Sequence, residues 1–190
     1  MPQVSVKGEI VEAATSVFRR SGFHGASIQD IAVVAGVPKG SVYNHFTSKV
    51  DLARVVVQRY AEGTSTGLLK GDGPALLRIR AHLEAELTRT RQSGLEFGCL
   101  LGNMAQELGD EGLAELREVV DASFKGWINA LAEAIGEAQQ THEIASTLES
   151  HALAGLIIDA LEGTALRTKA LGTTEALDGF VDMVFATILD

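Results

Sequence analysis

The sequence predicts an all-α protein of about nine helices, with a helix-turn-helix near its N-terminus and a larger helical region after it. Apolar residues recur at helical spacing along most of the 190 residues, and no strand-type alternation or tandem repeat appears. Proline, which interrupts helices, occurs only 3 times. The Gly-rich stretch GTSTGLLKGDGP is typical of a connection. We therefore place a domain boundary there, which gives domains of residues 1–62 and 63–190.

Local cap signals define the first two helices. The first is expected from Val6 to Ser21, because one apolar stripe runs along it and Gly22 follows. The second begins after Ser27, which forms a capping-box pattern with Asp30 three residues later. It ends at Gly36, where a left-handed residue is needed.

The third helix is short, and the fourth follows it closely. Pro38 precedes the third, expected over Lys39–Phe46, in which only Val42 and Phe46 are core residues. The rest of this helix consists mostly of hydrogen-bond donors, so it is built to contact something outside the protein. A second capping box starts the fourth helix at Ser48, and this helix continues toward Gly63. Five further helices are expected over Pro74–Arg91, Gly98–Leu108, Gly112–Ala138, Ile144–Leu171 and Thr174–Leu189.

The net charge of −9 is divided unevenly along the chain. Residues 1–60 carry 7 basic and 4 acidic side chains, and residues 61–190 carry 9 and 21. The first part is therefore basic overall, as phosphate contacts require, and the second part is strongly acidic. No run of 18 uncharged apolar residues and no signal-peptide pattern is present, so we expect a cytoplasmic protein without a membrane span. One cysteine excludes an internal disulfide framework.

The stretch from Ile10 to Leu52 resembles the DNA-binding domain of the TetR family of bacterial transcriptional regulators. The matching pieces are IVEAATSVFRRSGFHGASIQDIAVVAGV and PKGSVYNHFTSKVDL. The resemblance implies an all-α fold in which an N-terminal three-helix domain binds DNA and a C-terminal helical domain binds a ligand and dimerises. One departure is Asn44, where the family often has an aromatic residue.

The third helix and its surroundings supply the expected DNA contacts. Lys39 can donate to guanine O6 and N7, and Tyr43 can contact a thymine methyl group or a phosphate. His45 and Lys49 are expected on phosphates, while Ser27 is either a phosphate contact or purely a cap. The full expected set is Ser27, Gln29, Lys39, Gly40, Ser41, Tyr43, Asn44, His45 and Lys49.

The last two long helices are apolar on more than one face, so each must bury more than one face. In the resembling family these helices form the interface of a homodimer, whereas in a monomer they would be internal. The residues expected to face a partner subunit are Leu156, Ile157, Ala160, Phe180 and Val184.

Several residues of the C-terminal domain could line a pocket for a small, mostly apolar effector, although each alone could be a core residue. They are His82, Phe97, Cys99, Met104, Phe124, Trp127 and His151. Cys99 is either a small buried hydrophobe or a sensor thiol, as similar segments occur in family members that respond to electrophiles. His82 and His151 have no third ligand at metal spacing, so no metal is expected. No catalytic or cofactor motif appears.

The sequence therefore predicts a regulator, most simply a repressor, that binds a pseudo-palindromic operator as a homodimer and is released by a small-molecule effector. Three alternatives remain. The first is a thiol-based electrophile or redox sensor of the same fold that uses Cys99. The second is a non-catalytic protein-interaction module that uses the N-terminal helices. The third is an enzyme on a helical scaffold, for which the sequence offers no support.

Overall fold

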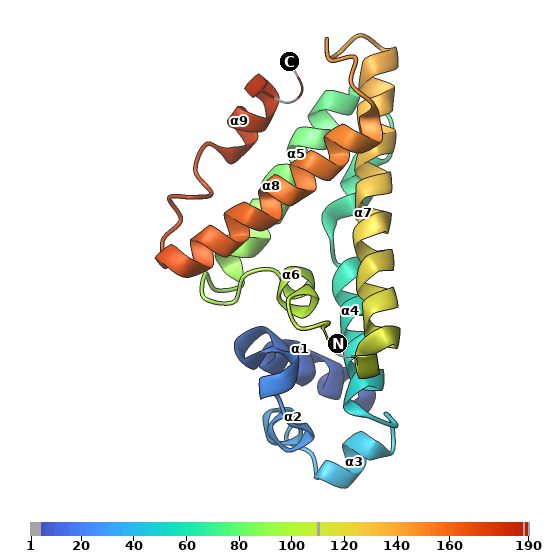
Figure 1. Cartoon of the computed structure of the whole chain (residues 1–190), viewed down its shortest axis with the longest axis vertical. Coiled ribbons are helices and arrows are strands. Elements are labelled where there is room, and N and C mark those ends of the chain that lie inside the picture. Colours follow the sequence, from blue (N-terminus) through green and yellow to red (C-terminus); the bar gives the residue numbers. More distant parts are fainter. Residues whose placement is uncertain (1–4, 110, 188, 190) are drawn as a thin grey trace. The chain divides into compact units, whose positions relative to one another are not determined.

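The computed structural model describes residues 5–109, 111–187 and 189, and every regular element in them is a helix (Figure 1). Nine α-helices and two 3-10 segments lie in this described part, which confirms the all-α class. The chain forms two compact units. One consists of the residues up to Gly63 with Leu100–Ser123, and the other consists of Thr64–Cys99 with residues from Phe124 onward. The segment Leu100–Ser123 thus packs with the N-terminal helices, which a single boundary after residue 62 does not anticipate.

The N-terminal unit is built around α1, which packs against α2, α4 and α6. Its largest fully buried side chains include Ile10, Phe18, Ile31 and Leu52, so one apolar core joins the helix-turn-helix to its neighbours. In Figure 1, α2 and α3 form one end of this unit. The helices are α1 (Val6–Gly25), α2 (Ile28–Ala35), α3 (Lys39–Tyr43), α4 (Lys49–Glu62), α6 (Leu100–Ala105) and the start of α7 (Ala114–Gln140), preceded by the 3-10 segment η2 (Glu111–Leu113).

Two helices of this unit differ from the sequence-based expectation. Helix α1 continues past Ser21 to Gly25, but Gly22 has φ 72° and ψ 178°, which kinks the helix where we expected it to end. Helix α3 is only five residues long and ends at Tyr43, with Asn44 as its C-cap. Phe46 still reaches the core from the turn that follows, as the pattern predicted.

The C-terminal unit contains the 3-10 segment η1 (Ser65–Leu69), α5 (Ala75–Gln92), the rest of α7, α8 (Ser150–Leu171) and α9 (Phe180–Thr187). Ile79, Leu83, Leu131 and Ile135 are fully buried in its core. Among the described residues, no helix has the length and continuous apolarity that crossing a bilayer requires.

Helices α8 and α9 start later than expected, at Ser150 and Phe180. Glu149 caps α8 by accepting a hydrogen bond from the Ala152 N–H at 2.7 Å, so the residues from Ile144 up to this cap form a connection. Helix α8 ends at Gly172, whose φ of 68° suits a glycine.

Two arginines of α5 hold the α9 region in place. Arg80 pairs with Asp182 at 2.9 Å and lies over the Phe185 ring, at 4.2 Å from its centroid. Arg91 pairs with Asp178 at 3.1 Å. These contacts tie the short α9 to a longer helix of the same unit.

Candidate functional site

The turn between α2 and α3 has the geometry of a helix-turn-helix. Ser27 and Asp30 form the expected capping box: the Asp30 N–H donates to Ser27 Oγ at 3.1 Å, and the Ser27 N–H donates to Asp30 Oδ2 at 3.0 Å. Gly36 has φ 67° and ψ 25°, and its N–H donates to the Val33 carbonyl. These local bonds fix the direction in which α3 leaves the turn.

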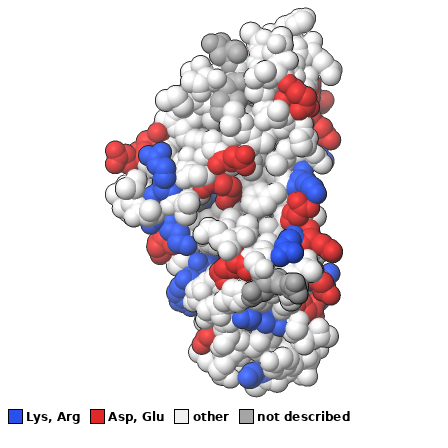
Figure 2. Space-filling model, viewed as in Figure 1, with Lys and Arg blue, Asp and Glu red and all other residues white. Residues whose placement is uncertain are grey.

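Helix α3 buries very little of its own surface. Val42 and Phe46 are in the core, while Tyr43 is 51% exposed, which separates it from a core aromatic. Ser41 is half-buried. The other expected base or phosphate contacts are exposed to solvent, namely Gln29, Lys39, Gly40, Asn44 and His45. On the face shown in Figure 2, the α2–α3 end carries scattered basic side chains and few acidic ones.

The hydroxyl of Ser27 is already engaged in the cap. It donates to Asp30 Oδ2 at 2.6 Å and accepts the Asp30 N–H at 3.1 Å. These hydrogen bonds hold the pKa of Asp30 below its ordinary value, so the carboxylate remains charged and continues to accept the hydrogen bond from the Ser27 hydroxyl. Ser27 therefore has no free proton to donate to a phosphate while the cap is formed.

Lys49 is also engaged inside the protein. Its Nζ donates to the carbonyl oxygens of Phe23 at 2.9 Å and Ala26 at 3.0 Å, and lies 4.4 Å from the centroid of the Phe23 ring. Burial lowers the pKa of Lys49, and the nearby Glu107 carboxylate partly opposes this shift. Two of its three N–H bonds are thus used within the N-terminal unit, which leaves one for a phosphate.

Of the expected effector residues, the structure brings His82 and Trp127 together. The Trp127 indole N–H donates to His82 Nε2 at 2.8 Å, and the rings meet edge to face. Both side chains are buried, and His82 is 0% exposed. Burial lowers the pKa of His82, against the opposing effects of the Ser65 backbone and Glu86. The imidazole is therefore neutral at pH 7 and carries its proton on Nδ1, which makes no well-formed hydrogen bond in the described part of the chain.

Charged side chains that the helical pattern does not identify extend this pair into a polar cluster, of which His82, Glu86 and Trp127 are buried. Glu86 is buried, accepts the Ser65 N–H at 2.8 Å and pairs with Arg89. Burial raises the pKa of Glu162, an effect opposed by a hydrogen bond from Cys99 and by Arg89. We name His82, Glu86, Arg89, Trp127, Glu162 and Cys99 the polar cluster.

The remaining expected effector residues are scattered. Met104 is buried on α6 in the N-terminal unit. Phe97 and Phe124 are half-buried. His151 is exposed and lies within hydrogen-bonding distance of Asn129 Oδ1, at 3.1 Å, beside a shallow hollow between α7 and α8. Within the described residues, no group of three or more His, Cys, Asp or Glu side chains could hold a metal ion.

The residues expected at a dimer interface divide into two groups. Ile157 and Val184 are buried in their own protomer, so they have little surface to offer a partner. Leu156 is 53% exposed, and Ala160 and Phe180 are half-buried beside a hollow between α8 and α9. Sequence periodicity missed the other exposed apolar side chains on these two helices, which are Leu166, Leu171 and Met183.

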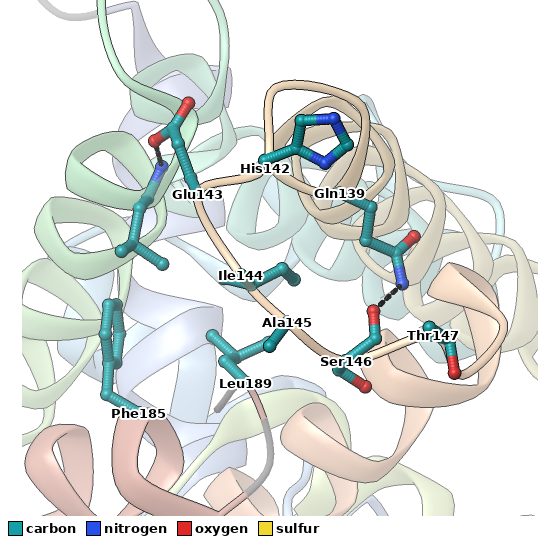
Figure 3. A pocket seen from close by; sticks show the side chains of 10 residues that line it. Gln139, His142, Glu143, Ile144, Ala145, Ser146, Thr147, Phe185 and Leu189 are labelled. Atoms are coloured by element: carbon teal, nitrogen blue, oxygen red, sulfur yellow. Dashed lines mark hydrogen bonds between the residues drawn. The ribbon is translucent and has the colours of Figure 1, made fainter.

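Another hollow, of about 740 Å³, lies where the α7–α8 connection meets α5 and α9 (Figure 3). Ile144, Phe185 and Leu189 form its apolar wall, and Gln139 donates to the Ser146 carbonyl at 3.0 Å on its polar side. Glu143 at its rim accepts the N–H groups of Ala75 and Leu76 at 3.1 and 2.9 Å. This carboxylate is therefore the cap of α5.

We expect the stabilising effect of Glu143 to depend on pH. Its hydrogen bonds with the Leu76 N–H and the Thr141 hydroxyl hold the pKa of Glu143 below the ordinary value of 4.5. A carboxyl group whose pKa is lower in the folded state stabilises the protein above its unfolded pKa, and this effect disappears as the pH falls through the folded pKa. Glu143→Gln should therefore lower the melting temperature more at pH 7 than at pH 3.

Thermal melts between pH 3 and pH 7 test this, with Glu133→Gln as the control, because Glu133 is an exposed carboxylate on α7. A difference between parent and Glu143→Gln that stays constant over this range would contradict the capping role.

Comparisons with known proteins agree with this geometry. A family model described as bacterial regulatory proteins of the tetR family matches residues 10–56, and a tetracyclin repressor-like C-terminal domain model matches residues 75–184. The HTH-type transcriptional repressor DhaR of Mycobacterium sp. (strain GP1) is 32% identical over 196 residues, which cover 100% of this chain and 95% of DhaR. The transcriptional regulator AcuR of Cereibacter sphaeroides is 28% identical over 84% of this chain and 74% of AcuR.

A solved structure has the same fold. The regulatory protein TetR from Rhodobacter sphaeroides is 26% identical and superimposes with a TM-score of 0.83, over 93% of this chain and 95% of that one. The C-terminal family model alone covers more than half of the chain, and the match to DhaR spans it completely. The chain therefore belongs to the TetR family of bacterial transcriptional regulators.

Proposed function

We propose that this regulator is a ligand-responsive repressor that acts in the cytoplasm, binds a pseudo-palindromic operator as a homodimer and is released by a small organic effector. The observation that carries the proposal is α3, a five-residue helix with one buried side chain and an exposed surface rich in donors. Such a helix contributes little to the core and is shaped to enter the major groove. As a member of its family, the chain is a DNA-binding regulator and not an enzyme.

The exposed residues divide by the kind of contact they are suited to. Lys39 and Gln29 can donate to base edges, and Tyr43 can contact a thymine methyl group or a phosphate. Gly40 is exposed and has no Cβ, so its backbone can approach the DNA closely. His45 and the remaining N–H of Lys49 suit phosphates, which fix the register without reading sequence.

The dimer is supported by the apolar surface of α8 and α9. Leu156, Leu166, Leu171 and Met183 are each more than half exposed in the single chain. A second copy that covers this face would bury them and would present two copies of α3 to successive major grooves.

The effector is supported by the polar cluster, which lies in a unit whose buried side chains are mostly apolar. An amphipathic molecule whose polar end meets His82 or Glu162 and whose body meets apolar side chains fits this chemistry. Because ligand and operator would bind different conformations, each would weaken the binding of the other by the same factor.

The proposal is tested with the DNA upstream of the protein's own gene and of its neighbours. Fluorescence anisotropy should reveal a specific site with two-fold symmetry, bound by two chains, and metabolites that raise the melting temperature of the free protein should release it. Binding that does not distinguish any fragment from random DNA of equal length would reject the proposal.

Lys39→Ala is expected to weaken specific binding by about 1–3 kcal/mol and to relax sequence preference, because Lys39 is exposed at the start of α3. Lys70→Ala is the matched control, since Lys70 is an exposed lysine of the C-terminal unit. Anisotropy titrations against the operator and single-base variants measure both effects. Equal losses of operator affinity in the two variants would show that Lys39 contributes only its positive charge and no specific contact.

Thiol-based sensing is the second candidate, and one observation favours it: Cys99 is half-buried and lies beside Glu162 in the polar cluster. The thiol proton is nevertheless engaged by the Glu162 carboxyl group, which disfavours attack on an electrophile. We expect alkylating agents to label native Cys99 slowly and without releasing the operator. Rapid labelling coupled to release, abolished in Cys99→Ser, would establish the sensor instead.

A further inference from the structure

The backbone at the end of α1 lies between two oppositely charged side chains. On one side, the Glu107 carboxylate accepts the Phe23 N–H at 3.1 Å and the His24 N–H at 2.7 Å. On the other side, the Lys49 ammonium donates to the carbonyl oxygens of Phe23 and Ala26. We name Glu107, Lys49 and the backbone of residues 22–26 the turn bracket.

The turn bracket depends on a glycine. At Gly22, φ 72° with ψ 178° is a conformation that other residues rarely adopt, and it kinks α1 so that the next two N–H groups reach Glu107. A Cβ at this position would lie 2.1 Å from Glu107 Oε1, well inside contact distance. The backbone conformation and the close approach of the carboxylate therefore both require glycine here.

The turn bracket also joins segments that are far apart in the sequence. Glu107 follows α6, and Lys49 is the first residue of α4. Ala26, the last residue held by Lys49, is followed by Ser27, the cap of α2. Because only this cap separates the bracket from α2, and α2 packs on α3, we expect a shift of residues 23–26 to reach α3.

We propose that Glu107 is a positioning residue for operator binding, which acts by fixing the start of α2 through the backbone of Phe23 and His24. The inference rests on the proposed DNA-binding function and adds to it a residue outside the helix-turn-helix. The expected change in operator affinity is opposite to the change that simple electrostatics predicts. Removing a negative charge from a DNA-binding unit should strengthen binding to every sequence, whereas removing a positioning residue should weaken specific binding.

The test compares Glu107→Gln with Glu118→Gln, which removes an exposed carboxylate from the same unit. Glutamine can accept one of the two N–H groups, but its own NH₂ faces the other. We expect Glu107→Gln to bind the operator more weakly, by up to roughly a hundredfold, because part of the hydrogen-bond energy that fixes the turn in the parent would have to be supplied on binding in the variant. Its affinity for random DNA and the salt slope should not fall, and Glu118→Gln should bind the operator at least as tightly as the parent.

Circular dichroism and thermal melts measure the stability of each variant. Binding is then measured at a temperature where every variant is folded. Glu107→Asp provides a second variant that keeps the charge but shortens the reach, and it should lose specific affinity in the same way. Operator binding by both Glu107 variants that equals or exceeds the parent's would overturn the proposal. Equal losses of affinity for operator and random DNA would also overturn it, because they would indicate a purely structural role for Glu107. A parent protein that binds no operator would refute the proposed function itself.

Discussion

Leu156→Asp is expected to convert the protein into a monomer and to remove tight operator binding. Leu156 is 53% exposed on α8, so in a single chain an aspartate there would remain in water and would reduce the folding stability little. In the proposed dimer the same aspartate would be buried without a partner, at a cost of several kcal/mol. Loss of the second DNA-binding domain should then reduce operator affinity by about 10²–10⁴, the range typical of bivalent binding.

The matched control for this variant is Leu77→Asp, because Leu77 is 61% exposed on α5 and lies outside the α8–α9 face. Sedimentation at micromolar concentration should give twice the chain mass of 20.1 kDa for the parent and the control, and a single chain mass for Leu156→Asp. A Leu156→Asp protein that remains dimeric and binds its operator normally would place the interface elsewhere.

Trp127→Phe is expected to destabilise the C-terminal unit more than an ordinary aromatic exchange. Trp127 is buried, and its indole N–H is the donor to His82 Nε2. Phenylalanine fills less space and leaves a buried acceptor unpaired, which costs about 1–3 kcal/mol for the acceptor alone. Urea unfolding at pH 7 should show this loss, and His82→Phe combined with Trp127→Phe should cost less than the two changes added together.

The same pair gives a pH signature. Because burial lowers the pKa of His82 below its ordinary value of 6.5, the unfolded chain takes up a proton at mildly acidic pH that the folded chain does not. Stability should therefore decline as the pH falls below about 6.5, and His82→Phe should flatten that decline. An unchanged slope in the variant would show that His82 is not held neutral by the fold.

The sequence predicted the N-terminal elements well where the determining interactions are local. The capping box of Ser27 with Asp30 and the left-handed Gly36 involve residues three or four positions apart, so their spacing alone identifies them. Val42 and Phe46 were likewise identified as core residues, although the structure places Phe46 after the end of α3.

What the sequence did not reveal depends on partners distant along the chain. Glu107 binds Phe23 across 84 residues, and Trp127 meets His82 across 45. The helical pattern does not reveal that Glu86 is buried or that burial raises the pKa of Glu162, because the side chains around them are distant along the chain. Lys49 has the spacing of a phosphate ligand, but the α1 kink brings two carbonyl groups to its ammonium. Periodicity identifies an apolar face but not what covers it. Ile157 and Leu156 were therefore both predicted to face a partner subunit, although only Leu156 is exposed.

The uneven charge of the chain has a consequence for how DNA approaches it. Residues 1–60 are net basic and residues 61–190 are net acidic, so the attraction of a negatively charged duplex falls on the first part of the chain. At physiological salt the field is screened over about 8 Å, so this attraction acts only during the last nanometre of approach. We therefore expect the acidic remainder of the chain to discourage DNA from wrapping around it, so that phosphate contacts depend on the local basic side chains of the helix-turn-helix region.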